Sequence, residues 1–310
     1  MSTVACFAPA SIGNFAAGFD VLGAAVRPLD GSLWGDVVEA RTSDHDSLDV
    51  RGSFAHTLNI APDSNLVMKA LHAISRRLPE GRPPLALTLD KGLPIESGIG
   101  SSAASAVAAV GAVNAVLGEP LDAAELLACA GEAESAASGS VHLDNVAPSL
   151  LGGLRLITSG GQAESLPFPG GLVLVLFLPR LSLSTRRARS VLPAEVSLST
   201  TVAHAQNLAG LIHALYQGDR ELLGKSLQDL LAEPHRAHLV PGFRSVQEAV
   251  MAAGALGCSL SGSGPAVFAL SEEADAEPVA AAGTEAWAAL GVACQARLCE
   301  VDLEGARRVA

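Results

Sequence analysis

Two glycines and a run of hydroxyl side chains stand directly before an apolar helical pattern, and this feature restricts the fold of the 310-residue chain more than any other. The glycines are Gly98 and Gly100, and residues 101–117 are rich in Ala and Val with no internal Pro. A helix N-terminus carries unpaired N–H groups and the positive end of the helix dipole, so it favours a bound anion. We therefore expect a strand–loop–helix unit whose loop binds phosphate. The alternative is a polar connection whose serines only cap the helix.

Two better-known phosphate motifs do not describe this loop. Gly98-x-Gly100-x-x-Ala103 formally satisfies the dinucleotide fingerprint G-x-G-x-x-G/A, but that fingerprint needs its first glycine directly after a strand. Gly98 instead lies nine residues after Leu89, the end of an alternating strand pattern, and Pro94 stands between them. A Walker A loop needs Gly-Lys-Ser/Thr, which does not follow here. The loop therefore predicts phosphate binding of another kind.

Strand and helix patterns are mixed in both halves of the chain, which predicts an α+β fold. In the first half, the glycine-rich loop is followed by helices over 101–117 and 122–137, a break at 138–140 and a loop at 142–145. In the second half, we expect a buried strand over 172–178, helices near 199–216, 219–231, 243–253 and 276–290, and strands within 258–270 and 293–299. The stretch 159–162 is the most linker-like, so we place a boundary near residue 164, between domains 1–164 and 165–310.

The composition excludes several classes of protein. Lys and Arg total 20 against 32 Asp and Glu, and the net charge of −12 argues against nucleic acid or an anionic membrane surface as a partner. The longest strongly apolar run, Gly171–Leu178, is too short to span a bilayer. Five cysteines without a C-x-x-C pair fit reduced thiols, and no Lys or Arg precedes Arg27. We therefore expect a soluble cytoplasmic protein.

The glycine-rich segment, with its pattern Pro94-x-x-x-Gly-Ile-Gly-Ser-Ser-Ala-Ala, resembles the phosphate loop of the GHMP small-molecule kinase family. Residues 8–23 are similar to the N-terminal motif of this family, and residues 260–270 to its C-terminal glycine-rich motif. Three more segments resemble the branch of the family that phosphorylates homoserine: 142–148, 185–193 and 233–243. Six matches in order over nearly the whole chain are hard to explain by chance.

The resemblance implies a fold and a reaction. The fold is a two-domain GHMP kinase architecture, with a ribosomal-protein-S5-like N-terminal half, a ferredoxin-like C-terminal half and the active site between them. The reaction uses ATP and Mg²⁺ to phosphorylate the side-chain hydroxyl of L-homoserine to O-phospho-L-homoserine, in threonine biosynthesis. A homodimer is compatible with this assignment. The alternatives are a GHMP kinase for a different small alcohol and a degenerate nucleotide-binding regulator.

By resemblance, the nucleotide and metal sites lie around the glycine-rich loop. Mg²⁺ takes oxygen ligands and keeps several waters, so one hydroxyl and one carboxylate suffice beside the ATP phosphates. These are Ser102 and Glu134, for which helix capping and a solvated helix face are the alternatives. Glu96 departs from the small residue usual in the family and brings a carboxylate to the loop. The expected nucleotide-binding residues are Pro94, Ile95, Glu96, Ser97, Gly98, Ile99, Gly100, Ser101, Ser102, Ala103 and Ala104.

Homoserine is a zwitterion, so its site needs a cationic clamp for the carboxylate and an anion for the ammonium group. The resemblance assigns Arg189 and Arg236 to the carboxylate and Asp20 to the ammonium group. It places Thr185 and His142 in the same pocket. The alternatives are an exposed basic turn for Arg189, a surface position for Arg236 and a structural role for His142.

The remaining assignments concern the reacting hydroxyl and the adenine ring. Asn14 and Asn145 are the candidates for holding the hydroxyl, and since Asn cannot act as a base, positioning and charge stabilisation would dominate. Asp144 is the residue that would supply a base, which typically contributes about 10²–10⁴-fold. Residues 62–66 and Trp34 are candidates for the adenine site, with a helix cap and a core aromatic as the alternatives.

Overall fold

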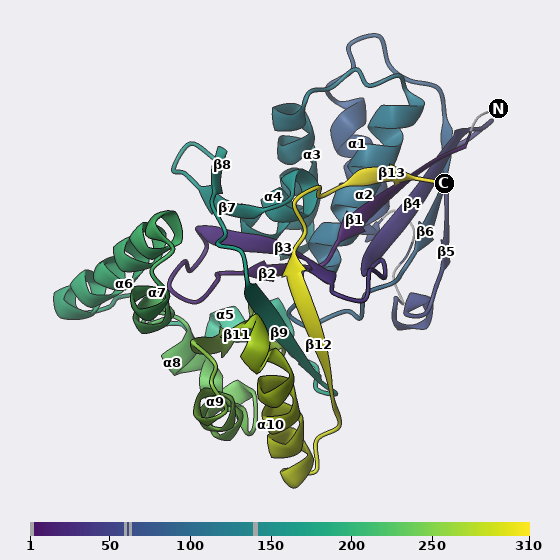
Figure 1. Ribbon diagram of the computed structural model, residues 1–310. Helices are drawn as coiled ribbons and strands as arrows, with labels where there is room; N and C mark the ends of the chain where they lie inside the picture. Colours follow the sequence, from purple (N-terminus) through teal and green to yellow (C-terminus); the bar gives the residue numbers. More distant parts are fainter. Residues whose placement is uncertain (1–2, 59–60, 62–63, 139–141) are drawn as a thin grey trace.

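Helices cover one face of a five-stranded sheet in the first lobe of the computed structural model, which describes residues 3–58, 61, 64–138 and 142–310 (Figure 1). The strand order is β13-β1-β4-β6-β5, and only the β5–β6 pair is parallel. The strands are β1 (Val4–Pro9), β4 (Gly35–Thr42), β5 (Ser47–Arg51), β6 (Leu85–Asp90) and β13 (Arg307–Val309). The helices are α1 (Leu66–Ser75), α2 (Ser101–Val116) and α3 (Ala123–Ser138), with a 3₁₀ turn η1 (Ala55–Thr57).

Helix α2 is the centre of this lobe. It packs on β1 and β4, while α1 and α3 pack against it from the other side. Its small residues allow a close approach, since a Cβ atom at Gly111 would lie 2.4 Å from Cys6 Sγ on β1. A helix enclosed on all sides is apolar all round, which explains the Ala- and Val-rich pattern. The helix predicted over 101–117 is therefore confirmed, and its N-terminus emerges from a packed core.

The second sheet continues through both halves of the chain. Its order is β10-β11-β9-β12-β3-β7-β8, and β2 also pairs with β3. The strands are β2 (Ser11–Gly13), β3 (Leu22–Pro28), β7 (Leu154–Ile157), β8 (Ala163–Leu166), β9 (Leu172–Pro179), β10 (Gly257–Leu260), β11 (Val267–Glu272) and β12 (Cys294–Val301). Strand β9 lies between β11 and β12 and is almost wholly buried, which confirms the strand predicted over 172–178.

The helices of the second lobe lie on and beside this sheet (Figure 1). They are α5 (Thr185–Ser190), α6 (Leu198–Gln217), α7 (Arg220–Ser226), α8 (Glu233–Arg236), α9 (Phe243–Ala252) and α10 (Ala276–Ala289), with 3₁₀ turns η3 (Ala237–Leu239) and η4 (Glu273–Asp275). Helix α10 crosses β9 closely, because Gly283 leaves space that a Cβ atom would share with the Phe177 ring, 2.3 Å away. Both chain ends lie in the first lobe, where β13 pairs with β1 (Figure 1).

Helix α4 (Leu143–Leu151) packs on β3, β7 and β2, so it lies directly against two of the N-terminal strands. The fit is tight, because a Cβ atom at Gly23 would lie 1.6 Å from the carbonyl oxygen of Asp144. At Gly13 a Cβ atom would lie 2.3 Å from Asn145 Nδ2. The helix thus presents Asp144 and Asn145 to the segment that follows β2.

Two predictions of local structure are wrong. Residues 142–145 were expected to form a loop, but α4 begins at Leu143, because Val146, Ala147 and Leu150 find buried partners in the folded protein. The helix expected over 219–231 ends at Ser226, because the Asp229 carboxylate accepts hydrogen bonds from the backbone N–H groups of residues 231–233 and favours a turn.

Two boundary predictions have different outcomes. The linker-like stretch 159–162 forms the turn between β7 and β8, where Thr158 N–H donates to the Gln162 carbonyl at 2.9 Å. The boundary near residue 164 falls within β8 and stays a prediction. The helix break expected at 138–140 falls partly outside the described residues, as do residues 62 and 63 of the adenine candidate.

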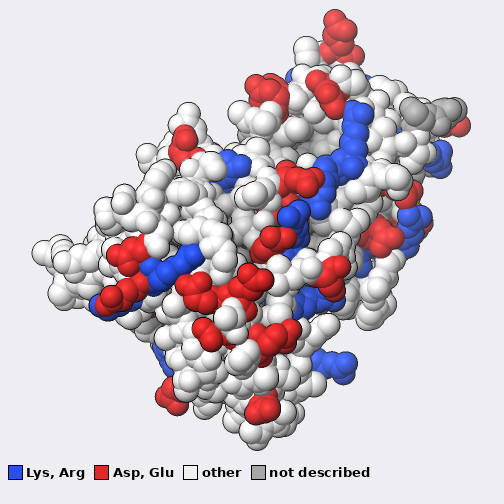
Figure 2. Space-filling model, in the orientation of Figure 1, with Lys and Arg blue, Asp and Glu red and all other residues white. Residues whose placement is uncertain are grey.

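Acidic and basic side chains are interspersed on the face shown in Figure 2, so the negative net charge is not gathered into one acidic surface there. Among the described residues, no helix combines the length and the apolar character that a membrane crossing requires. Two apolar cores lie under this surface, and Phe15 stacks on Phe268 with a centroid distance of 5.3 Å where the two halves of the chain meet.

Candidate active site

The glycine-rich loop has a backbone shape that only small residues adopt easily. Gly98 (φ +83°) and Gly100 (φ +67°) lie in the left-handed region. A Cβ atom at Gly100 would lie 2.0 Å from Ser11 Oγ, so this position also has no room for a side chain. Glu96 is left-handed as well (φ +52°), which gives a physical reason for the small residue usual there.

Segments from three other parts of the chain hold this loop. Ser11 N–H donates to the Ile99 carbonyl at 3.1 Å, and Ser261 Oγ donates to the Gly98 carbonyl at 2.6 Å. Ala266 N–H donates to the Ser97 carbonyl at 3.0 Å. The Glu96 carbonyl accepts from Leu183 N–H, and its carboxylate accepts from Ser182 Oγ at 2.5 Å. The N-terminal motif and the C-terminal glycine-rich motif therefore meet at the predicted phosphate loop.

The predicted metal ligands lie together at the start of α2. Ser102 Oγ donates a hydrogen bond of 2.6 Å to Glu134 Oε2, which reaches across from α3. Burial raises the pKa of Glu134, and the hydrogen bond from Ser102 only partly offsets it. A largely enclosed carboxylate next to a hydroxyl is a hard oxygen pair, so the donor set fits Mg²⁺.

Next to the loop, the carboxylate and guanidinium predicted to bind opposite ends of a zwitterion are paired with each other. Arg189 Nη2 and Nη1 lie 2.6 Å and 3.2 Å from the two oxygens of Asp20. His142 Nδ1 lies 3.4 Å from Asp20 Oδ1 and 3.0 Å from Arg189 Nη2. Burial opposes the ionisation of Asp20, but the hydrogen bonds from His142 and Arg189 outweigh it and lower the pKa of Asp20 to about 2. The pair thus stays charged, and a ligand bearing both charges could exchange with it.

Arg236 is 2% exposed and completes the cationic side of the pocket. It donates to the carbonyls of Ala188 and Gly262, at 3.1 Å and 3.2 Å. The Phe19 ring lies beneath both guanidinium groups, 5.2 Å from that of Arg236 and 5.7 Å from that of Arg189. Burial and the neighbouring Arg189 lower the pKa of Arg236, but an arginine remains charged in proteins. Two guanidinium groups therefore lie on one side of a hollow that Asp20, Glu134 and Asp144 also line, and an anionic ligand group can bind on the arginine side.

Asp144 lies deeper, at 3% exposure. Burial and, after it, the negative charge of Asp20 raise its pKa to about 6, against the opposing effect of the hydrogen bond that it accepts from Asn14 N–H at 3.1 Å. The Asn14 side chain is held by the protein itself, since Oδ1 accepts from Asp20 N–H and Nδ2 donates to the Gly262 carbonyl. Asn145 Oδ1 accepts from Ser11 Oγ at 2.9 Å. Asp144 is thus a carboxyl whose protonation can change near neutral pH.

Two small adjoining hollows join these groups into one site. One, of about 70 Å³, is lined by Asn14, Asp20, Glu134, His142, Asp144, Asn145, Thr185, Arg189, Arg236, Gly262 and Ser263. The other, of about 100 Å³, is lined by Glu134, Asn145, Thr185, Gly262 and Ser263 together with Glu96, Ser97, Gly98, Gly100, Ser101, Ser102 and Ala103. The structure therefore brings together every predicted substrate-binding, catalytic and metal-binding side chain. Pro94, Ile95, Ile99 and Ala104 do not line either hollow, and Ile99 and Ala104 are buried in the core.

Trp34 and Asn65 take the alternatives offered for them, a core aromatic and a helix cap. Trp34 is 7% exposed and belongs to the core, and Asn65 caps α1 by accepting a hydrogen bond from Val67 N–H. Neither residue lines the two hollows at the loop.

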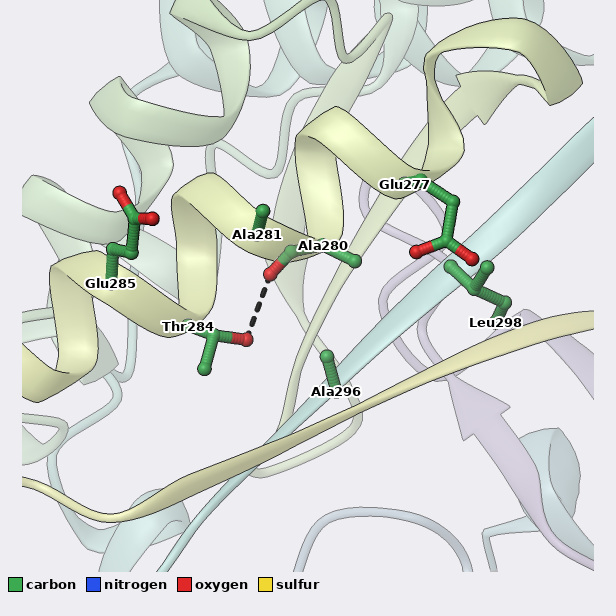
Figure 3. A pocket seen from close by; sticks show the side chains of 7 residues that line it. All are labelled: Glu277, Ala280, Ala281, Thr284, Glu285, Ala296 and Leu298. Carbon is green, nitrogen blue, oxygen red and sulfur yellow. Dashed lines mark hydrogen bonds between the residues drawn. The ribbon is translucent and has the colours of Figure 1, made fainter.

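A wider hollow of about 480 Å³ lies elsewhere, between α10 and β12 (Figure 3). Alanines and the aliphatic side chain of Leu298 line it, and Thr284 Oγ1 donates to the Ala280 carbonyl rather than to the hollow. Its two charged groups, Glu277 and Glu285, stand apart on α10 (Figure 3). It shares no residue with the site at the loop.

Several residues of the site were not predicted. Ser11 touches both the loop and Asn145, Phe19 supports the two arginines, and Gly262 and Ser263 line both hollows. All four lie in segments that resemble family motifs, so the signal was present in the sequence. The sequence did not show which contacts these residues make, because contacts between segments far apart in the chain leave no local pattern.

The comparisons with known proteins agree with this arrangement. The model for the GHMP kinases N terminal domain matches residues 65–153, and that for the GHMP kinases C terminal domain matches residues 211–289. The chain belongs to the GHMP kinase family. The two-domain GHMP kinase architecture predicted from the sequence is thereby confirmed.

Among solved structures, this GHMP kinase is similar to homoserine kinase from Cytophaga hutchinsonii, with 36% identity and a TM-score of 0.92 over 100% of this chain and 98% of that one. It also shares its fold with mevalonate kinase from L. major in complex with R-mevalonate, at 16% identity and a TM-score of 0.69 over 96% of each chain. Phosphomevalonate kinase from Streptococcus pneumoniae matches at 15% identity and 0.67, over 100% and 99%. The 36% identity to homoserine kinase and the two family models support a kinase that acts on the hydroxyl of a small molecule.

Proposed function

We propose that this GHMP kinase transfers the γ-phosphoryl group of ATP, with Mg²⁺, to the side-chain hydroxyl of L-homoserine and forms O-phospho-L-homoserine for threonine biosynthesis. The observation that carries the proposal is the Asp20–Arg189 pair, with Arg236 beside it, at the edge of the phosphate loop. The 36% identity to a homoserine kinase over the full chain supports the same substrate.

The charges of the pocket favour a zwitterion over a simple hydroxy acid. A substrate with a carboxylate and an ammonium group can take over both partners of the Asp20–Arg189 pair, so no buried charge loses its counterion. Mevalonate has a carboxylate and no ammonium group, so it would leave Asp20 with one partner fewer. Thr185 and His142 line the same hollow and add polar contacts for an amino acid.

We assign the reaction steps to residues as follows. The backbone of residues 97–103 at the start of α2 holds the phosphates. Ser102 and Glu134 would hold Mg²⁺, which supplies positive charge to the phosphates when bound. Asn145 aligns the hydroxyl of the substrate, while Asn14 holds Asp20 and the Gly262 carbonyl in place. Positioning and charge stabilisation then carry the transfer, and Asp144, which lines the same hollow, is the residue that would accept the proton.

ADP release with MgATP tests the proposal when L-homoserine, L-serine, L-threonine and mevalonate are compared at equal concentrations. We expect a strong preference for L-homoserine. We also expect Arg189→Met to lower kcat/KM for homoserine about 10- to 100-fold, since it removes a charged hydrogen bond to the substrate. The matched control is Arg186→Met, an exposed arginine of the same helix.

The other outcomes separate the alternatives. Preference for another alcohol would assign a different GHMP kinase activity, and ATP binding without turnover of any alcohol would favour a regulator. A cytoplasmic location is also proposed, because all five cysteines are unpaired thiols. The division into domains 1–164 and 165–310 is kept as a proposal, although β13 returns to the first sheet.

A further inference from the structure

A buried lysine and a buried aspartate lie directly behind the glycine-rich loop, outside both hollows of the site. Lys91, 1% exposed, follows β6, and Asp36, fully buried, lies on β4. Lys91 Nζ and Asp36 Oδ2 are 2.5 Å apart. The cost of burying two charges is offset only when each also has further hydrogen-bond partners. The hydrogen-bond partners of Lys91 and Asp36 therefore show which segments this pair holds together.

The partners of Asp36 lie on both sides of the loop. Oδ1 accepts hydrogen bonds from the backbone N–H groups of Gly92 and Leu93, at 3.0 Å and 3.1 Å, in the segment that enters the loop. Oδ2 accepts from Ser105 Oγ at 2.6 Å, in the first turns of the helix that leaves the loop. One carboxylate thus ties the incoming chain to the outgoing helix.

Lys91 makes the same connection from the other direction. It belongs to the incoming segment, and its Nζ donates to the Ser101 carbonyl at 2.9 Å and to Ser105 Oγ at 3.0 Å, both on α2. A third link joins the two sides directly, because Ser101 Oγ donates to the Leu93 carbonyl at 3.2 Å. The seven residues 94–100 are therefore closed at their base by a buried polar network.

The loop needs this network to keep its shape. Two of its seven residues are glycines in the left-handed region, and glycine loses more conformational freedom on ordering than any other residue. A loop that orders only when phosphate arrives loses binding free energy, whereas a loop held in its bound shape does not. The contacts from Ser11 and Ser261 hold the middle of the loop, but they do not set the distance between its two ends.

We propose that Lys91 and Asp36 are positioning residues for the nucleotide: the buried pair, with Ser105, holds the two ends of residues 94–100 so that the loop presents its N–H groups to phosphate. Neither residue lines the two hollows, so their effect reaches the reaction through the loop. The inference rests on the proposed role of this loop as the ATP phosphate site. It predicts that loosening the network weakens ATP binding more than it weakens homoserine binding.

Ser105→Ala tests this with little risk to folding, since it removes one hydroxyl and leaves the ion pair in place. Ser105→Ala removes the hydrogen bonds to both Asp36 and Lys91, and we expect the Kd for MgATP, measured by titration calorimetry, to rise about three- to tenfold. KM for ATP should rise with it, while KM for L-homoserine stays within about twofold. Asp36→Asn is the stronger variant, because its amide oxygen can still accept from the incoming segment but its NH₂ group cannot accept from Lys91 or Ser105.

The matched control is Asn114→Ala, on the same helix at its far end. Asn114 is 5% exposed, and its side chain donates to and accepts from the backbone of Leu121. This variant should lower the melting temperature as Ser105→Ala does and leave the Kd for MgATP unchanged. Tight binding of MgATP to the unaltered protein with no change in Ser105→Ala, or an equal loss in Asn114→Ala, overturns the inference alone. Absence of MgATP binding in the unaltered protein overturns the proposed function as well.

Discussion

Asp144→Asn is expected to stabilise the protein at neutral pH. The Asp144 carboxyl is 3% exposed, and burial followed by the charge of Asp20 raises its pKa from 3.8 to about 6. A pKa difference of about 2 between the folded and unfolded states corresponds to about 3 kcal/mol, at about 1.36 kcal/mol for each unit. The ionised carboxylate therefore makes the folded state about 3 kcal/mol less favourable than a neutral side chain would.

The sign of this effect depends on pH. Because the pKa of Asp144 is raised in the folded state, the protein binds the proton more tightly than the unfolded chain does. Well below pH 3.8 the carboxyl is neutral in both states, and well above about pH 6 it is ionised in both. The stability that Asp144 contributes is thus present at low pH and is lost as the pH rises between these values. The Asn variant has no such loss.

Urea unfolding of the metal-free and nucleotide-free protein at pH 4 and pH 7.5 measures the effect as a difference between variant and wild type, in which the other titrating groups cancel. The gain of Asp144→Asn should be below about 1 kcal/mol at pH 4 and about 3 kcal/mol at pH 7.5, since the pKa of about 6 already includes the hydrogen bond from Asn14 N–H. A gain that does not change with pH would refute the reasoning. The turnover of the same variant tests whether Asp144 acts as a general base. Nearly full activity would mean that positioning and charge stabilisation carry the reaction, and a loss of about 10²–10⁴-fold would indicate a general base.

Two further predictions concern the glycine-rich loop. Gly100→Ala places a Cβ atom 2.0 Å from Ser11 Oγ in a left-handed backbone. We therefore expect urea unfolding to show a stability loss of about 1–3 kcal/mol, and the Kd for MgATP to rise. An unchanged Kd would contradict the tight fit of the loop. Glu96→Gly relieves left-handed strain of about 1–2 kcal/mol but adds about 0.5–1 kcal/mol of backbone entropy, so stability should change little while KM for ATP falls as a carboxylate leaves the hollow. A rise in turnover from near zero in this variant would favour the degenerate regulator instead.

Much of the core could be predicted because its signals are local. The absence of Pro and the run of Ala and Val over 101–117 predict a helix, and the structure has α2 at Ser101–Val116. The apolar run over 172–178 predicts a buried strand, and β9 spans Leu172–Pro179. In both elements the local sequence favours the same secondary structure that packing in the core stabilises, so the sequence pattern alone predicts the element.

The elements that could not be predicted depend on partners far away in the chain. Helix α4 begins where a loop was expected, because its apolar residues fit against β3 and β7. The last strand, β13, has three residues and no pattern of its own, and it exists because β1 offers an unpaired edge. Such elements gain their stability from tertiary contacts, which no local pattern records.

The sequence by itself determined the glycine-rich loop, the helix behind it and, through the order of six motifs, the residues that gather at one site. The tertiary structure alone decided how these residues interact. Asp20 and Arg189 are 169 positions apart, and only folding pairs their charges. Lysine is a residue type usually found on the surface, yet Lys91 lies buried against Asp36. Charge pairing and burial are properties of distance in space, and a chain acquires those distances only when it folds.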